Sequence, residues 1–277
     1  MKTQTTTHTT TPPHAHEEAV AVETKHWRKK GTSCLKRSLK AITGALVLAV
    51  MSATLASAGS IPIPGLCSTG MNSSCTGTAT IGSIDPNWTL ATPYPSSPSG
   101  QPLPSPPWNL TYGPAYVNTP NGFWLANSST SQWTTPQNES NLGGNYVYAT
   151  SFNIPVGYDP ATASITGFWT SDNEGIEVWL NQQQITGFPL PGAGDSDKAF
   201  PFTINSSDAT FQSGLNTLYF EIRNRGLGGN DNDPTDTGIR VEFQSSLVGA
   251  APEPSSLLLM GSGVLGLGGV LRRKLKA

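Results

Sequence analysis

The sequence has no histidine after residue 58, and between residues 59 and 250 it has a single lysine, Lys198. Without histidine, this region excludes Ser–His and Cys–His catalytic pairs and zinc held by histidine. It also lacks a glycine-rich phosphate-binding motif, so phosphoryl transfer has no basis. We therefore expect a protein that is not an enzyme.

Basic charge is scarce in the same region. Residues 59–250 carry fourteen acidic side chains against four basic ones, a balance of −10 that the net charge of −2 for the whole chain hides. So negative a region repels phosphate backbones, and nucleic acid is not an expected partner.

The N-terminus has the pattern of an export signal. Basic residues precede the apolar stretch "AITGALVLAVMSATLASA", which predicts a leader and signal peptide over residues 1–58 with cleavage after Ala58. Cys34 falls in this leader, leaving Cys67 and Cys75 in the exported chain. In an oxidising compartment, these two cysteines are expected to form a disulfide.

The C-terminus combines three features in order. Pro252, Glu253 and Pro254 precede 17 uncharged residues, and basic residues follow at 272–274 and 276. As a helix, the uncharged stretch would rise about 26 Å, slightly short of a ~30 Å hydrocarbon layer. We expect a short transmembrane helix with its basic end in the cytoplasm.

These C-terminal residues, "PEPSSLLLMGSGVLGLGGVLRRKLKA", resemble the PEP-CTERM sorting signal of Gram-negative bacteria. The resemblance implies recognition by an exosortase, cleavage near Pro252, Glu253 and Pro254, and transient membrane anchoring. Delivery to the cell surface or an exopolysaccharide matrix is then expected. An ordinary membrane helix is the alternative, but it leaves the Pro-Glu-Pro triplet unexplained.

Alternating apolar residues dominate from about residue 110 onward and predict strands. No stretch of ten or more residues there has a helical stripe, so we expect an all-β, jelly-roll-like two-sheet sandwich. The apolar faces are predicted at Tyr146/Tyr148/Phe152/Ile154, Ala163/Ile165/Trp169, Ile176/Val178/Leu180, Phe200/Phe202/Ile204, Leu218/Phe220/Ile222 and Ile239/Val241/Phe243, with further strands in "PAYVNT" and "GFWLAN".

The sandwich is expected over residues 85–246 and the sorting signal over 247–277. Residues 59–84 are small and polar, so they are predicted to form a surface linker that builds no core. Segments such as "DPNW", "GNYVYATSFNIP" and "DPTDTGIRVEF" resemble, in their order, a galactose-binding-like β-sandwich. This resemblance implies sugar or surface recognition.

Binding residues are predicted on the outward faces of two strands. Alternation turns Trp179 and Tyr219 away from the apolar sets, and Asp172 and Asn173 are expected at the head of the Trp179 hairpin. Aromatic rings beside acids and amides suit sugars. The alternative is that both rings pack beneath loops.

Further acidic residues offer oxygen ligands or paired carboxylates. Asp231, Asp233 and Asp236 are hard oxygen donors that can hold a structural calcium ion, although a solvated turn explains them as well. Glycoside hydrolysis needs paired carboxylates, for which the sequence offers Asp172, Glu174 and Glu177, or Asp195 and Asp197.

The sequence thus predicts an exported, exosortase-sorted β-sandwich that binds a polysaccharide or envelope glycan without catalysis and requires no cofactor. A purely structural biofilm protein and a glycoside hydrolase are the two alternatives.

Overall fold

A computed structural model describes residues 59–94, 106–137, 141–251 and 254–276. The predicted signal peptide, Pro252 and Glu253 lie outside the described residues. The chain divides into two units, 1–56 and 57–277, and the description below concerns the second.

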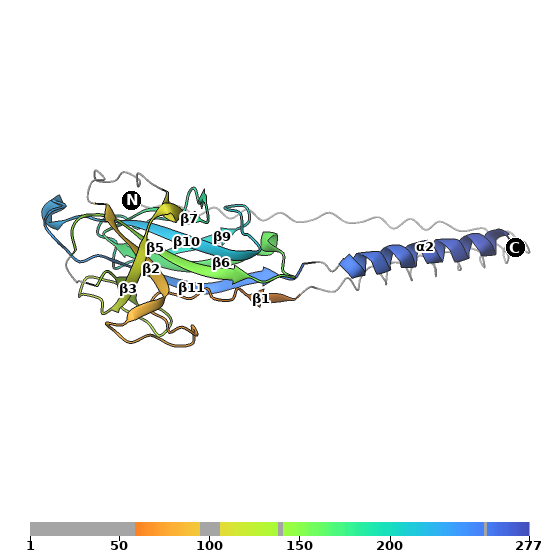
Figure 1. The fold of residues 1–277 in the computed structure, drawn as a ribbon, viewed down its shortest axis with the longest axis horizontal. Coiled ribbons are helices and arrows are strands. Elements are labelled where there is room, and N and C mark those ends of the chain that lie inside the picture. The colour runs from red at the N-terminus through yellow and green to blue at the C-terminus, as the bar shows by residue number, and fades with distance from the viewer. Residues whose placement is uncertain (1–58, 95–105, 138–140, 252–253, 277) are drawn as a thin grey trace, which may run out of the picture. The chain divides into compact units, whose positions relative to one another are not determined.

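The described part of the second unit forms eleven strands of one antiparallel sheet (Figure 1). The strands are β1 (Ser60–Pro62), β2 (Ile84–Tyr94), β3 (Tyr112–Asn118), β4 (Trp133–Thr135), β5 (Gly144–Ile154), β6 (Ser164–Asp172), β7 (Glu174–Leu180), β8 (Gln183–Gln184), β9 (Phe200–Asn205), β10 (Gly214–Asn224) and β11 (Gly238–Gly249). Short 3-10 turns lie at Pro107–Asn109 (η1), Pro160–Thr162 (η2) and Leu227–Gly229 (η3).

The sheet curls on itself into a sandwich. Its order is β8-β7-β10-β5-β2-β3-β4-β11-β6-β9, with β1 paired to β11. One core joins the two halves, because Trp169 of β6 lies 5.3 Å from Phe220 of β10 between ring centroids. The predicted all-β sandwich is confirmed.

The period-two pattern located most strands correctly. Each predicted apolar set contributes to the main core and lies in a strand, apart from Ala163, which directly precedes β6; β5 shows the pattern best through Tyr146, Tyr148, Phe152 and Ile154. The set on β7 is the exception: Val178 and Leu180 are in the core, but Ile176 is only half-buried. A register shift where β7 pairs with β10 breaks the alternation there.

One predicted strand needs correction. "GFWLAN" is not a strand: Gly122 and Phe123 form a turn, and Leu125 and Ala126 continue in irregular backbone. After Leu180 the chain forms a tight hairpin into β8, because Asn181 adopts a positive φ of 55° that asparagine tolerates better than most residues.

The segment 59–84, expected to be a surface linker, is part of the sandwich. Ile63, Leu66 and Met71 are buried, and β1 pairs with the end of β11. Short polar sequences can still be buried when their backbone groups find partners. Here the buried carboxylate of Asp85 accepts hydrogen bonds from the Gly70 backbone N–H and the Thr134 hydroxyl, both at 2.7 Å.

The structure joins Cys67 and Cys75, whose Cα atoms are 5.4 Å apart, by a disulfide. Cys67 is 2% exposed, and its carbonyl oxygen accepts a 3.0 Å hydrogen bond from the indole N–H of Trp88, which is also buried. The disulfide therefore closes a loop that is anchored in the core.

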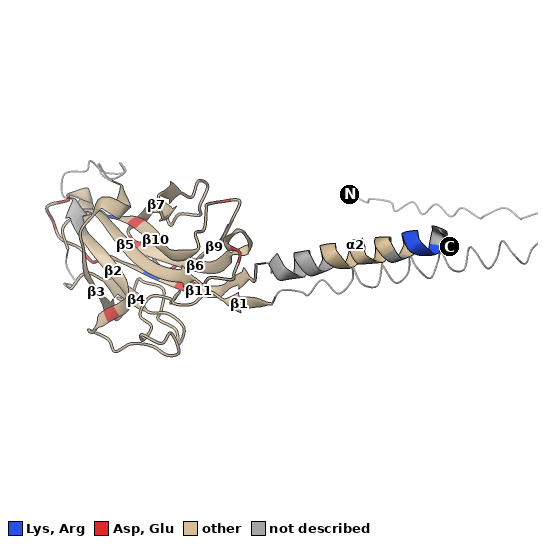
Figure 2. Cartoon of the chain, turned by 45° about the vertical axis from the view of Figure 1, so that its right-hand side comes forward, with Lys and Arg blue, Asp and Glu red and all other residues tan. Residues whose placement is uncertain are grey.

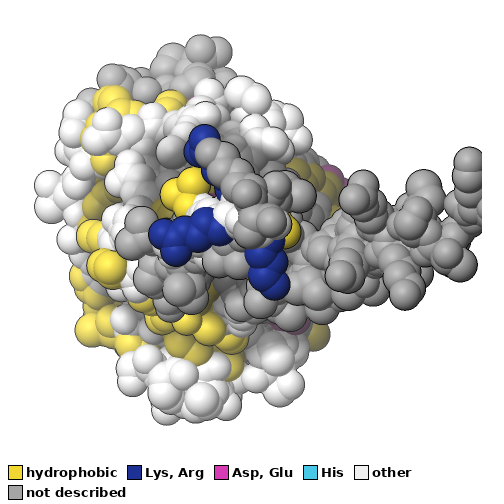
Figure 3. Space-filling model, turned by 90° about the vertical axis from the view of Figure 1, so that its right-hand side faces the viewer, with side chains coloured by type: hydrophobic (Ala, Val, Ile, Leu, Met, Phe, Trp, Pro, Cys, Tyr) yellow, Lys and Arg dark blue, Asp and Glu magenta, His cyan; other side chains and the backbone are white. Residues whose placement is uncertain are grey.

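The C-terminal helix α2 spans Pro254–Lys276. Arg272, Arg273 and Lys274 lie near its C-terminal end, where they are exposed (Figures 2 and 3), whereas the acidic residues lie in the sandwich (Figure 2). The prediction that it crosses a membrane is not met: no helix among the described residues is both long enough and apolar enough to do so. Eight of its 17 consecutive uncharged residues are glycine or serine, which add little hydropathy.

The packing of the 67–75 loop leads to a stability prediction. Replacing Cys75 with serine should lower the free energy of unfolding by about 2.5 kcal/mol, because the unfolded chain gains loop entropy. For a domain of this size, the melting temperature should fall by roughly 5–10 °C. Thermal denaturation of the oxidised protein measures this effect. Ser73→Ala, an exposed change in the same loop, is the control, and equal melting curves for the two variants would contradict the prediction.

Candidate functional site

A pocket of about 250 Å³ lies at one end of the sandwich. It is formed where the long β3–β4 connection meets the end of the β10–β11 connection. Its walls are mostly hydroxyl, amide and carboxylate groups around one indole ring. The lining residues are Asn118, Thr119, Pro120, Asn121, Trp124, Thr135, Asp236 and Thr237.

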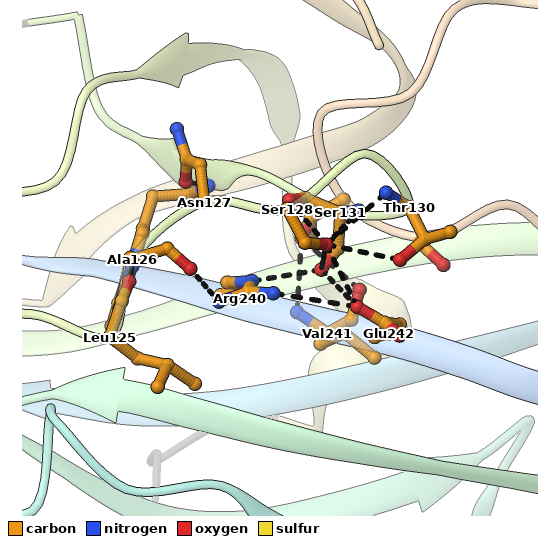
Figure 4. A network of polar contacts seen from close by, with 12 residues as sticks. Leu125, Ala126, Asn127, Ser128, Thr130, Ser131, Arg240, Val241 and Glu242 are labelled. Atoms are coloured by element: carbon orange, nitrogen blue, oxygen red, sulfur yellow. Dashed lines mark hydrogen bonds and ion pairs between the residues drawn. The ribbon is translucent and has the colours of Figure 1, made fainter. Parts of the chain in front are cut away.

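The β3–β4 connection is held in place by a buried cation (Figure 4). Arg240 of β11 is 3% exposed, and its guanidinium donates to the Ala126 carbonyl and, at 2.8 Å, to the Ser131 hydroxyl. The guanidinium also lies 5.5 Å from the ring centroid of Phe168. Because a buried charge needs partners, this arrangement specifies one position for the loop.

Glu242 completes the anchor. Its carboxylate accepts hydrogen bonds from the hydroxyls of Ser131 (2.8 Å) and Ser128 (3.1 Å), and forms an ion pair with Arg240. Burial by itself would raise the pKa of Glu242, but these hydrogen bonds and the Arg240 charge together lower it. The carboxylate is therefore ionised at neutral pH, as the buried arginine requires.

The anchored connection presents two adjacent aromatic residues differently. Trp124 is buried against Trp133, with ring centroids 4.3 Å apart, and it lines the pocket. Phe123 is 84% exposed, although its backbone N–H is fixed by a 3.0 Å hydrogen bond to the Asn121 side chain. An exposed ring on a well-held loop is an unusual use of a large apolar side chain.

Asp172, a predicted binding residue, lies behind Trp124. Its carboxylate accepts hydrogen bonds of 2.9 Å from the Trp124 indole N–H and from the Asn173 amide. Burial raises the pKa of Asp172 to about 6; the two hydrogen bonds oppose the rise, and the nearby charge of Asp236 adds to it.

Asp236 connects the two loops that form the pocket. Its Oδ2 atom accepts a 2.8 Å hydrogen bond from the Asn121 amide. Thr237, the next residue, donates from its hydroxyl to the Asp172 carbonyl at 2.6 Å. The end of the β10–β11 connection is thereby tied both to the β3–β4 connection and to the end of β6.

The predicted hairpin that was to bring Asp172 and Trp179 together does not exist. β6 pairs with β11 and β9, whereas β7 pairs with β10 and β8, so the chain crosses between the two halves of the sheet at Asn173. Trp179 lies six residues beyond Asn173, which is about 20 Å along an extended strand.

Alternation did place Trp179 and Tyr219 together, directly opposite each other on the outer face. That face is nevertheless covered. Trp179 is half-buried with its ring edge-to-face to Trp108 at 5.3 Å, and Tyr219 is 9% exposed beside Tyr112. A second hydrophobic cluster forms there because residues 108–112 fold over the sheet.

The three aspartates considered for calcium do not converge. Asp231 forms a bidentate ion pair with Arg223 at 2.8 and 2.9 Å, Asp233 accepts from Asn230, and Asp236 accepts from Asn121. Within the described ranges, no group of three or more His, Cys, Asp or Glu side chains is arranged to hold a metal ion.

The carboxylates considered for hydrolysis are also engaged separately. Glu174 forms two 2.8 Å contacts with Arg225, Glu177 accepts from Gln184, and Asp195 pairs with Lys198. Among the predicted site residues that the structure describes, Asp236 lines the pocket, and Asp172 is joined to its wall by the hydrogen bond from Trp124. Phe123 and Trp124 were missed because the alternation in "GFWLAN" predicts a strand, and Asn121 precedes that segment with no pattern of its own.

In a comparison with known protein families, residues 250–274 match the PEP-CTERM protein-sorting motif. This confirms the resemblance of the C-terminal residues to that sorting signal. No curated protein matches the chain.

The half-buried carboxyl of Asp172 should make stability depend on pH. Its pKa of about 6 lies above the ordinary value of 3.8, so the folded state loses stability as pH rises from about 4 to 6. Replacement by asparagine removes this dependence. We therefore compare the unfolding free energy of Asp172→Asn with that of wild type at each pH. Because the side chain is only half-buried, we expect the variant to gain about 1–2 kcal/mol relative to wild type between pH 4 and 7.5.

Urea denaturation at several pH values measures this shift. The exposed Asp233→Asn is the control for the change in net charge. Parallel pH profiles for wild type and Asp172→Asn would contradict the prediction.

Proposed function

Since this chain is a PEP-CTERM sorting-domain protein, exported and processed by an exosortase to a surface location, we propose that its sandwich is a non-catalytic module that binds a glycan. The glycan is a component of the envelope or of an exopolysaccharide matrix.

The observation that carries this proposal is a polar pocket lined by Asn121 and Trp124, on the same short loop as Phe123, whose ring is 84% exposed and does not itself line the pocket. The C–H face of a sugar stacks on an aromatic ring, while its hydroxyls need donors and acceptors close by. Asn118, Asn121 and Thr119 line the pocket with amide and hydroxyl groups, and Asp236 adds a carboxylate acceptor.

The rigidity of the loop supports the same function. Arg240 fixes Ala126 and Ser131, and the backbone N–H of Leu125 donates to the Ser196 carbonyl at 2.8 Å. A loop that is already ordered loses little entropy when it binds a ligand. Loops positioned by a rigid sheet are common binding sites for this reason.

The two alternatives predict different outcomes. A purely structural protein would bind no glycan at this pocket. A hydrolase would cleave a bound glycan, and the neighbouring carboxyls of Asp172 and Asp236 are the pair that would be needed. The Oδ2 atom of Asp172 accepts a hydrogen bond from Trp124, and its Oδ1 atom accepts one from Asn173. These two bonds support a positioning role for Asp172.

Sorting predicts a change in covalent structure. We expect the surface form of the protein to end near Pro254 and to lack α2, because the exosortase removes the helix. Mass spectrometry of protein released from the cell surface measures this. Replacing Glu253 with alanine should prevent the cut, and recovery of wild-type surface protein intact through Ala277 would contradict it.

Binding at the pocket predicts a specific loss in one variant. Phe123→Ala should reduce affinity for the best ligand on a glycan array at least tenfold, because a stacking contact of ~1.5 kcal/mol or more is lost. The melting temperature should change little, since the ring is exposed. Val156→Ala is the control, because Val156 is 93% exposed and lies just after the C-terminal end of β5. Unchanged binding by Phe123→Ala would refute this site, and cleavage of the bound glycan would show a hydrolase.

A further inference from the structure

The charges around the pocket define the class of sugar that it can accept. Resting on the proposed function, we propose that the pocket prefers sugars with a protonated amine over neutral sugars and excludes sugars with a carboxylate.

Asp236 supplies the recognising group. It lines the pocket and is only half-buried, and its Oδ2 atom is engaged by Asn121. No protein donor contacts its Oδ1 atom in the part of the chain that the structure describes. A carboxylate oxygen at a pocket wall is a strong acceptor for an ammonium group, because charge-assisted hydrogen bonds are the stronger kind.

Asp172 strengthens the negative potential from behind the indole of Trp124. Its carboxyl is close enough to Asp236 for the two charges to affect each other. Glu174 and Arg225, whose backbone N–H donates to the Asn173 side chain next to Asp172, neutralise each other through their bidentate pair. An acidic sugar would therefore bring a third negative charge toward two that are not compensated.

The basic residues of the sandwich offer no counter-charge. All four between residues 59 and 250 are already in ion pairs with carboxylates: Lys198 with Asp195, Arg223 with Asp231, Arg225 with Glu174, and Arg240 with Glu242. Recognition of a uronate would require one of these pairs to break. The arrangement thus discriminates by repulsion as well as by attraction.

Three sugars that differ in one substituent test the proposal: glucose, glucosamine and glucuronic acid. Affinities would be measured by NMR titration of the isotope-labelled protein at pH 7, where an amine of this kind, like an α-amino group with a pKa near 7.7, is mostly protonated. We expect glucosamine to bind about fivefold more tightly than glucose, and glucuronic acid about fivefold more weakly. A fivefold change is the upper end of what one partly exposed charge pair contributes.

Asp236→Asn is the decisive variant, since asparagine keeps an oxygen for Asn121 but removes the charge. It should abolish the preference for glucosamine over glucose, and the ratio of the two affinities is the readout, because Asp236 also offers an acceptor to the hydroxyls of both sugars. Asp233→Asn, on the same β10–β11 connection but outside the pocket lining, should keep the preference. At pH 5, where Asp172 is mostly protonated, the exclusion of glucuronic acid should weaken by about twofold or more.

The outcomes separate the two proposals. Equal affinities for the three sugars, tightest binding of glucuronic acid, or an unchanged preference in Asp236→Asn would overturn the charge selection while leaving glycan binding in place. Absence of binding by every sugar, here and on the glycan array, would overturn both.

Discussion

Closure of one antiparallel sheet around a continuous aromatic core is the constraint on which the other features depend. Trp88, Trp169 and Phe220 come from three different strands and pack within a network of ring contacts. Because the two halves of the sheet share this core, their strands must end at common levels. The connections beyond β3, β6 and β10 are thereby brought together, and the pocket is a consequence of that closure.

Buried polar groups then determine where individual loops lie. Asp85 holds the 67–75 loop to β2 and β4, and Arg240 holds the β3–β4 connection to β11. Each buried charge is costly unless all of its partners are present, so each tolerates very few alternative loop positions. The same physical cost that makes these groups rare in cores makes them effective in fixing a binding loop.

The excess of acidic residues has a local counterpart at the pocket. Fourteen acidic and four basic side chains between residues 59 and 250 leave a surplus after every base is paired, and part of that surplus lies at Asp172 and Asp236. Such a potential attracts cationic groups and repels anionic ones over about a Debye length. A surface protein in a polysaccharide layer would meet both kinds of group.

The sequence by itself determined the class of fold, most strands and the sorting motif, because these depend on local patterns. Tyr146, Tyr148, Phe152 and Ile154 alternate along one strand, and the Pro-Glu-Pro triplet, the uncharged stretch and the basic end are contiguous. Only the tertiary structure decided which strands pair. It showed that β6 and β7 belong to different halves of the sheet, which separates Asp172 from Trp179.

The site depended on the same non-local information. Residues 119–126 and 236–237 are more than a hundred positions apart, and no period or spacing relates Asn121 to Asp236. The exposure of Phe123 and the burial of Trp124, its neighbour, follow from the Arg240 anchor and from packing against Trp133. Burial depends on what the rest of the chain places nearby, so local alternation could assign Trp179 to the outer face without showing that residues 108–112 cover it.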